Sequence, residues 1–312
     1  IEYRSEFNGI VHDMSQSGQT VYMEPMAVVQ MTNRIQGLRD DEALEIERIL
    51  YELSARTAEV SEELTMIDDH LHHLDMVFAK AKYGTAIGAT KPEISEARKV
   101  YLPAAFHPMI DPQEVVKNDI TIDEGSLAVI ITGPNTGGKT VILKTIGLAQ
   151  LMAQSGIPVP ARDGSILPIF KKIYSDIGDE QSIEQSLSTF SSHLTNTKVI
   201  IDNADDETLV LLDEVGAGTD PEEGAALAIG IIEDLLSKQS TLIATTHYPQ
   251  IKSFSYTRED VINASVEFDV NTLSPTYRLL MGIPGRSNAF EISNKLGLSP
   301  SIINRAKALV KS

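Results

Sequence analysis

The sequence lacks cysteine altogether, and no apolar run in its 312 residues reaches membrane-spanning length. Without cysteine there are neither disulfide bonds nor thiolate metal sites, which is consistent with a reducing cytoplasm, where we expect the protein. No signal-like segment opens the chain, so we expect no membrane partner. The chain begins with Ile1 rather than Met and ends at Ser312 in a helical pattern, which indicates part of a longer protein.

Basic residues are scarce: the chain has 26 Lys and Arg and 44 Asp and Glu, which gives a formal net charge of -18. This balance argues against a broad nucleic-acid surface, since phosphate backbones need clustered Lys and Arg. Local contact with a nucleic acid stays open. The excess acid otherwise describes a solvated helix surface that favours solubility. A hydrophobic content of 42% suffices for a substantial core in about two domains.

Proline is absent between Pro25 and Pro92, where apolar or tolerated residues recur in alternating steps of four and three. This heptad spacing predicts one long helix or two in series, about 75 Å long if roughly 50 residues are unbroken. Such a helix is either a stiff rod that carries motion to a distant binding surface or a helix of an ordinary bundle. Strand-like stretches at 10–12 and 20–23 predict a preceding hairpin. The heptad positions are Ile46, Leu50, Leu53, Thr57, Val60, Leu64, Ile67, Leu71, Leu74 and Phe78.

A glycine-rich segment, GPNTGGKT, follows the apolar run 127–132 and precedes a helical pattern. Strand, glycine loop and helix is the order that phosphate binding requires, whereas a plain flexible loop needs neither neighbour. The glycines let backbone N–H groups face the phosphate oxygens, and the helix adds its positive end. Lys139 is predicted to reach the β- and γ-phosphates, and the Thr140 hydroxyl to coordinate Mg²⁺. The residues predicted to hold ATP or ADP here are Gly133, Pro134, Asn135, Thr136, Gly137, Gly138, Lys139 and Thr140.

A second segment, LVLLDEVGAGTD, is an apolar strand over 209–212 that ends in Asp213 and Glu214. A doubly wound sheet places such a strand end at its ligand crevice. Asp213 is predicted to hold Mg²⁺ directly or through water, and Glu214 to act as general base on the attacking water. A third strand, 241–245, precedes His247, which we interpret as a γ-phosphate sensor rather than a structural histidine. The sequence therefore predicts an ATPase with Glu214, His247 and Lys139 as catalytic residues.

Ser188 and Thr189 lie in the polar block GDEQSIEQSLSTFSSH, after a predicted strand at 173–176. They resemble the cap of a following helix, whose N–H groups and hydroxyls suit a phosphate. An ordinary N-cap needs no ligand, and the residues alone leave both interpretations open.

In this order, GPNTGGKT, QSLSTFSSH, LLDEVGAGTD and ATTHY resemble the MutS superfamily of ATPases, which belongs to the ABC-type class. DPEEGAALA and YRLLMGIPGRSNAFEI look like its bacterial second-type branch, associated with suppressing homologous recombination. The resemblance covers almost the whole chain and implies an α/β fold, with a central mixed sheet flanked by helices and preceded by a long helical lever. The expected parts are a hairpin with coiled-coil-like lever or clamp helices (1–83), a linker (84–99), an ABC-type ATPase domain (100–290) and a helical dimerisation element (291–312).

The resemblance also implies a homodimer with composite ATP sites, in which Ser188 and Thr189 of one subunit complete the site of the other. Gln181 is then expected to sense Mg²⁺ and the γ-phosphate, and Asp220 to lie in a loop crossing between the two sites. Val115 stands where mismatch-repair members place an aromatic against adenine, and an aliphatic side chain packs on a base without π-stacking. The chain contains no mismatch-reading domain, so mismatch recognition is not predicted.

Three functions stay open at this point. The first is an ATP-driven switch whose clamp acts on branched or recombining DNA. The second is the same engine acting on stalled ribosomes through ribosome or rRNA binding, and the third is an ATP-gated dimerisation module with little turnover. A transporter ATPase is disfavoured because no LSGGQ-type block is present. Nuclease activity is not predicted from this segment, since the sequence shows no further metal-spaced His/Asp/Glu cluster.

Overall fold

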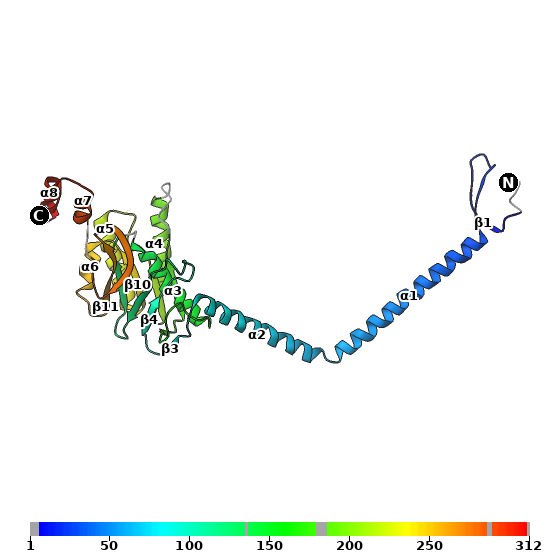
Figure 1. The fold of residues 1–312 in the computed structure, drawn as a ribbon, viewed down its shortest axis with the longest axis horizontal. Coiled ribbons are helices and arrows are strands. Elements are labelled where there is room, and N and C mark those ends of the chain that lie inside the picture. Colours follow the sequence, from blue (N-terminus) through cyan, green and yellow to red (C-terminus); the bar gives the residue numbers. More distant parts are fainter. Residues whose placement is uncertain (1–5, 135–136, 179–185, 286–288, 311–312) are drawn as a thin grey trace. The chain divides into compact units, whose positions relative to one another are not determined.

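A computed structural model describes residues 6–134, 137–178, 186–285 and 289–310 of the chain (Figure 1). The chain divides into two compact units, Ile1–Met76 and Val77–Ser312, and each is described by itself. Among the described residues, no helix combines the length and the apolarity that crossing a bilayer requires.

The first unit opens with a two-stranded hairpin, as the strand-like stretches at 10–12 and 20–23 predict. Strand β1 (Gly9–Met14) pairs antiparallel with β2 (Val21–Pro25), and Ser15 closes the turn. The Thr20 amide donates to Ser15 Oγ at 3.1 Å, and the Ser15 amide donates to the Thr20 carbonyl at 2.9 Å. These bonds satisfy the backbone groups of the turn. The antiparallel pairing of β1 and β2 confirms the predicted hairpin.

The proline-free segment forms two helices in series, which decides between the two arrangements that the heptad spacing allowed. Helix α1 spans Met26–Ala58 and α2 spans Ser61–Ile87. Ion pairs one turn apart support α1, with Arg48 between Glu45 and Glu52 and Arg56 on Glu52. The apolar heptad side chains are exposed in this chain, and α1 has no buried residue.

A small four-stranded sheet lies in the second unit, and its strands follow in the order β3, β7, β4 and β5. Strand β4 pairs antiparallel with β5 and with β7, and β3 runs parallel to β7. The segment 84–99, predicted as a linker, therefore contributes a strand to this sheet, although the division into domains stays a prediction. The bounds are β3 (Glu93–Ser95), β4 (Val100–Ala105), β5 (Asn118–Ile122) and β7 (Ile166–Pro168).

The larger sheet has six strands in the order β12, β11, β6, β10, β9 and β8. All its neighbouring pairs are parallel except β11 with β12, which is antiparallel, so the predicted mixed sheet is confirmed. Parallel strands bring their carboxyl ends to one edge, where ligands bind in sheets of this kind. The bounds are β6 (Ala128–Thr132), β8 (Lys172–Asp176), β9 (Thr208–Leu212), β10 (Thr241–Thr246), β11 (Val261–Asp269) and β12 (Ser274–Met281).

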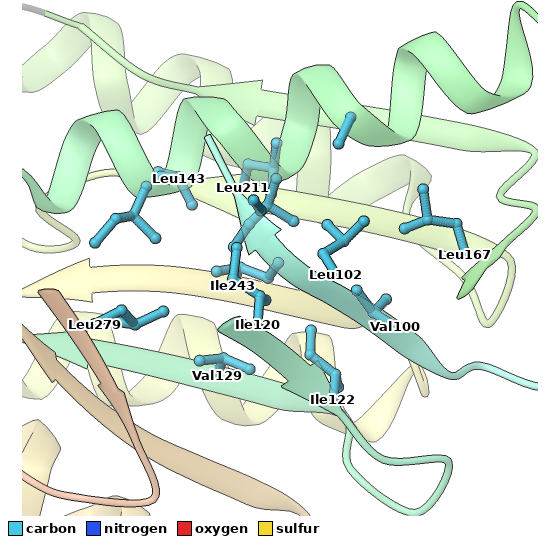
Figure 2. Packing of buried hydrophobic residues seen from close by; sticks show 14 of the residues in the cluster. Val100, Leu102, Ile120, Ile122, Val129, Leu143, Leu167, Leu211, Ile243 and Leu279 are labelled. Carbon is cyan, nitrogen blue, oxygen red and sulfur yellow. The ribbon is translucent and has the colours of Figure 1, made fainter. Parts of the chain in front are cut away.

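Helices cover both faces of this sheet, and its central strands are buried throughout. Val129 on β6 packs with α3 and the small sheet, and its neighbour Ile130 packs with α5, because successive side chains point to opposite faces. Figure 2 shows residues of the first of these layers, among them Leu143 of α3 and Leu211 and Ile243 of the sheet. The helices are α3 (Lys139–Gln154), α4 (Ser186–Asn203), α5 (Pro221–Ser237), α6 (Pro249–Ser255), α7 (Ala289–Lys295) and α8 (Pro300–Val310).

Candidate nucleotide site

The glycine-rich loop connects β6 to α3, as predicted. Gly138 has a φ of 84°, in the left-handed region, and α3 begins at the next residue. A Cβ added at Gly133 or Gly137 would lie 2.4 or 2.5 Å from Cγ2 of Val266 on β11, so a side chain would force the loop away from the sheet. Only glycine therefore fits the observed loop path at these positions. Asn135 and Thr136 lie outside the described residues.

Lys139 is buried at the first position of α3, with 1% of its surface exposed. Its Nζ donates to the Gly133 carbonyl at 2.7 Å, which places the ammonium group across the loop. Burial lowers the pKa of Lys139, while the charges of Glu214 and Asp213 raise it. The buried cation is thus held between the loop and two carboxylates.

Asp213 and Glu214 follow β9, and side chains from two other elements hold them. Thr140 Oγ1 donates to Asp213 Oδ2 at 2.6 Å. The Thr245 hydroxyl donates to the other carboxylate oxygen of Asp213, and it accepts the Glu214 amide at 2.8 Å. Thr245 is fully buried, and its role was missed from the sequence. The signal that could have identified Thr245 is the pairing register of β9 and β10. Ala244 lies opposite Leu212, so the residues that follow these two, Thr245 and Asp213, are neighbours.

The backbone turns sharply after Asp213. Glu214 has a φ of 48° and Gly216 a φ of 82°, and a Cβ on Gly216 would lie 2.3 Å from the Gly224 carbonyl oxygen. Asp220 then begins α5 as its N-cap, accepting the amides of Glu222 and Glu223 at 2.9 and 3.3 Å. Asp220 therefore has a local capping role. Its expected place in a loop between two sites stays a prediction.

His247 lies directly after β10, beside the glycine loop. With Gly133 and Pro134 it lines a cavity of about 330 Å³, to which Lys252 also contributes. The His247 ring lies 4.4 Å from the Tyr248 ring at an interplanar angle of 40°. The structure thus brings His247 to the loop, as the order of the motifs predicts.

Val115 lies at a second cavity, of about 260 Å³, on the α3 side of the loop. The same cavity is lined by Gly138 and Val141, and by His107 and Tyr277. Burial and the nearby charge of Lys144 lower the pKa of His107. Val115 is therefore adjacent to the glycine loop, as the resemblance implies.

The prediction that Ser188 and Thr189 cap a helix is wrong in position. Helix α4 begins at Ser186, so both residues lie in its first turn. The physical reason is the apolar spacing of Leu187, Phe190 and Leu194, which already follows a helical period before Ser188. Gln181 lies outside the described residues.

A second missed feature joins α4 to this edge of the sheet. His193 Nδ1 lies 2.8 Å from Asp176 Oδ2, and Asn196 Nδ2 donates to Asp176 Oδ1 at 3.3 Å. The Asp213 amide donates to the Asp176 carbonyl at 2.9 Å. Asp176, at the end of β8, therefore contacts both the acid pair and α4.

The oxygen ligands that Mg²⁺ prefers are present where the sequence predicts them. The Thr140 hydroxyl and the Asp213 carboxylate are in direct contact, and a hydroxyl with one carboxylate beside substrate phosphates is a usual Mg²⁺ environment. These residues therefore fit a Mg²⁺ ion. Within the described ranges, no group of three or more His, Cys, Asp or Glu side chains could hold a metal by itself.

The glycine loop between β6 and α3, together with the Asp-Glu pair that follows β9, defines a P-loop ATPase domain of the ABC type. The chain belongs to the MutS family through the domain described as MutS domain V, which matches residues 129–312. It is 60% identical over 309 residues to "Endonuclease MutS2" of Staphylococcus carnosus (strain TM300), covering 99% of this chain and 40% of that protein. To "Endonuclease MutS2" of Staphylococcus aureus it is 59% identical over 309 residues, covering 99% and 43%. The chain thus spans about two fifths of the length of these relatives.

Proposed function

We propose that this ATPase domain is the engine of a dimeric switch that acts on branched or recombining DNA and suppresses homologous recombination. The observation that carries the enzymatic part is the cluster in which Lys139, Asp213 and Glu214 meet at one edge of the sheet. A positive charge for phosphates, a metal ligand and a carboxylate for water are the parts that ATP hydrolysis needs.

Each side chain has a separate task in this reaction. With nucleotide bound, Lys139 would exchange the Gly133 carbonyl for phosphate oxygens, and Thr140 and Asp213 would hold Mg²⁺. When bound, the ion neutralises charge on the phosphates. Glu214 accepts a proton from the attacking water, and His247, across the loop, contacts the γ-phosphate. Thr245 keeps the backbone of Glu214 in place through its hydroxyl.

The dimer is proposed from family membership and from exposed apolar surface. In the C-terminal helical segment, Leu296, Leu298 and Ile302 are exposed to 73%, 44% and 53%. A second copy would bury this surface. Ser188 and Thr189, in the first turn of α4, would then act at the partner's nucleotide, where the positive helix end favours phosphate.

The nucleic-acid partner is proposed from the relatives. Their name, Endonuclease MutS2, assigns them cleavage of nucleic acid, and this chain covers about two fifths of their length. A comparison of four-way DNA junctions with ribosomes, each in the presence of ATP, tests the partner. Retention on junctions supports the proposal, whereas co-sedimentation with ribosomes alone would replace DNA by rRNA as the partner.

The Glu214→Gln variant tests the assigned base. We expect kcat for ATP to fall by about two orders of magnitude or more, because general base catalysis contributes roughly 10²- to 10⁴-fold. ATP binding should persist, since Lys139 and the glycine loop are unchanged. Glu259→Gln, in an exposed turn before β11, is the matched control and should hydrolyse ATP at the normal rate. Equal turnover by both variants would remove Glu214 from the mechanism.

Light scattering separates a switch from a dimerisation module. ATP-dependent dimers with steady turnover support the proposal. Dimers that form with ATP and persist with negligible hydrolysis would favour the module.

A further inference from the structure

We propose that Lys252 is a second phosphate-binding lysine of this domain. Its ligand is the terminal phosphate of the nucleotide, held either as part of the triphosphate or as the inorganic phosphate that hydrolysis releases. This assignment rests on the proposed function, because it concerns the same nucleotide. Lys252 lies on α6, outside the glycine loop and the three strand ends that carry the other site residues.

Lys252 is a half-buried cation in an acidic chain. Its Nζ donates to the Gly285 carbonyl at 2.5 Å. In the part of the chain that the structure describes, no carboxylate forms an ion pair with Lys252, although the sequence contains 44 Asp and Glu. A charge that is partly removed from water is normally compensated by an opposite charge, and a neutral carbonyl supplies only part of that compensation. Lys252 therefore suits an anionic ligand.

Lys80 shows the case in which a carbonyl partner is sufficient. Its Nζ donates to the Ser155 carbonyl at 2.6 Å, and Ser155 is the C-cap of α3. The carboxyl end of a helix carries a partial negative charge, so the helix itself compensates this lysine. Gly285 lies between the end of β12 at Met281 and the start of α7 at Ala289, and its carbonyl is not part of a helix end.

The backbone of Gly285 lies against the start of the glycine loop. Its amide donates to Thr132 Oγ1 at 3.1 Å, and Thr132 is the last residue of β6 before Gly133. Thr132 Oγ1 donates in turn to the Ala264 carbonyl at 3.1 Å. A Cβ on Gly285 would lie 3.0 Å from Thr132 Oγ1, so the two segments are in close contact. The bond from Lys252 to Gly285 thus brings its ammonium group to this end of the loop.

Lys252 and His247 line the same cavity, of about 330 Å³, and Gly133 and Pro134 line it on the side of the loop. A water molecule takes about 30 Å³ of liquid volume, so the cavity has room for a phosphate group together with waters. The proposed reaction places the terminal phosphate on the side of His247. A phosphate at that position lies in a cavity to which Lys252 also contributes.

A phosphate at this place is a better acceptor for both lysines than the backbone is. Lys139 Nζ donates to the Gly133 carbonyl at 2.7 Å, as Lys252 Nζ donates to the Gly285 carbonyl. A phosphate oxygen adds the attraction between opposite charges, which a neutral carbonyl lacks. The ammonium group of Lys252 would then also stabilise the negative charge on the transferred phosphoryl group.

Calorimetric titration of the 312-residue chain with a non-hydrolysable ATP analogue and with ADP tests contact with the attached phosphate. Lys252→Met keeps the length of the side chain and removes its charge. We expect the Kd of the analogue to rise roughly tenfold, the smaller effect typical of losing a hydrogen bond to a charged group, because the site is only half-buried. The Kd of ADP should stay within about twofold, since ADP has no γ-phosphate.

Product inhibition tests contact with the released phosphate. Inorganic phosphate is added during steady-state ATP hydrolysis, and its inhibition constant is compared between the parent and Lys252→Met. If Lys252 holds the released ion, this constant should rise roughly tenfold even where the Kd of the analogue is unchanged. A parent chain that inorganic phosphate does not inhibit excludes the released form and leaves the analogue as the decisive ligand.

Two further variants serve as controls. Lys80→Met removes a lysine that also donates to a backbone carbonyl, away from this cavity, and should leave the Kd of the analogue and the inhibition by phosphate unchanged. Lys252→Arg keeps the positive charge and should bind the analogue within a few-fold of the parent. The Tm of each variant without nucleotide shows whether it is folded.

Two results would overturn the assignment. One is that Lys252→Met keeps both the Kd of the analogue and the inhibition by phosphate; if it then dimerises more weakly in light scattering, the cation binds an acidic side chain of a second copy instead. The other is an equal loss of affinity for the analogue and ADP, which indicates a general change in the loop. If the parent chain neither binds nor hydrolyses ATP, the proposed function itself fails, which is a different result from ATP hydrolysis that ignores Lys252.

Discussion

Thr245 is the residue whose replacement tests the geometry of the acid pair most directly. Its hydroxyl donates to Asp213 and accepts the Glu214 amide, and Thr245 has 0% of its surface exposed. Valine has nearly the same shape but no hydroxyl. Thr245→Val therefore leaves a buried amide and a buried carboxylate oxygen without this partner, and water cannot easily replace it.

The expected loss of stability follows from these two bonds. An unsatisfied buried group costs about 1–3 kcal/mol, so the two together cost roughly 2–6 kcal/mol. In a unit the size of Val77–Ser312, about 1 kcal/mol shifts the Tm by roughly 2–4 °C, which gives a drop of about 4–24 °C. Because Glu214 also loses its backbone anchor, kcat should fall by up to about 100-fold.

Calorimetry and ATP hydrolysis measure the two effects, and the same strand supplies the control. Thr241 is also buried, at 2% exposure, but among the described residues its hydroxyl has no hydrogen-bond partner. Thr241→Val should thus be neutral or slightly stabilising. If Thr245→Val and Thr241→Val have the same Tm and the same kcat, the bonds of Thr245 do not support the site and this reasoning is wrong.

Two further changes test other parts of the second unit. Gly216→Ala adds a Cβ 2.3 Å from the Gly224 carbonyl oxygen at a φ of 82°. We expect the free energy of unfolding in urea to fall by about 2–4 kcal/mol, and kcat to fall as well. Gly164→Ala is the control: it has a similar φ of 88° but lies in open space, so it should lose only about 1–2 kcal/mol. The bond from Lys172 lowers the pKa of Asp205 from 3.8 to about 2, so its stabilising effect is present above pH 3.8 and is lost as the pH falls to about 2. The stability difference between the parent and Asp205→Asn should therefore be constant from about pH 5 to 7, shrink below about pH 4 and disappear only below about pH 2; a difference that does not shrink over this range would contradict this origin.

The parts of the site that the sequence predicts are those whose residues are contiguous. Gly133 to Thr140 form a loop whose backbone path depends on its own glycines, and Asp213 and Glu214 follow an apolar strand directly. Such local relations survive in a linear pattern because the chain itself places the residues side by side. The mixed sheet was expected from the family resemblance that the ordered motifs carry, and the helical segment before it was predicted from the heptad spacing.

The parts that sequence reasoning missed depend on pairing between distant segments. Thr245 accepts the amide of Glu214, which lies 31 residues away in the sequence. Asn118 donates through Nδ2 to the backbone carbonyl of Tyr277, which lies 159 residues away. No local pattern marks these residues, because a threonine in a strand and an asparagine at a strand start are common in any sheet. Asn118 on β5 also accepts the Leu279 amide on β12 at 2.7 Å, beside Tyr277 with its positive φ of 58°. The start of α4 was placed too late because polar residues there conceal a helical spacing that begins at Leu187.

Asp176 shows how this site is connected to the proposed dimer contact. Its carbonyl accepts the Asp213 amide at 2.9 Å, and its carboxylate contacts His193 and Asn196 on α4. The side chain is 10% exposed, so these bonds lie in a poorly hydrated environment in which polar groups depend on their partners. A displacement of Asp213 must therefore either break a bond to Asp176 or move α4 with it. Since the first turn of α4 carries Ser188 and Thr189, Asp213 and the proposed partner contact are joined through one buried residue, Asp176, whose backbone carbonyl accepts the Asp213 amide and whose carboxylate contacts α4.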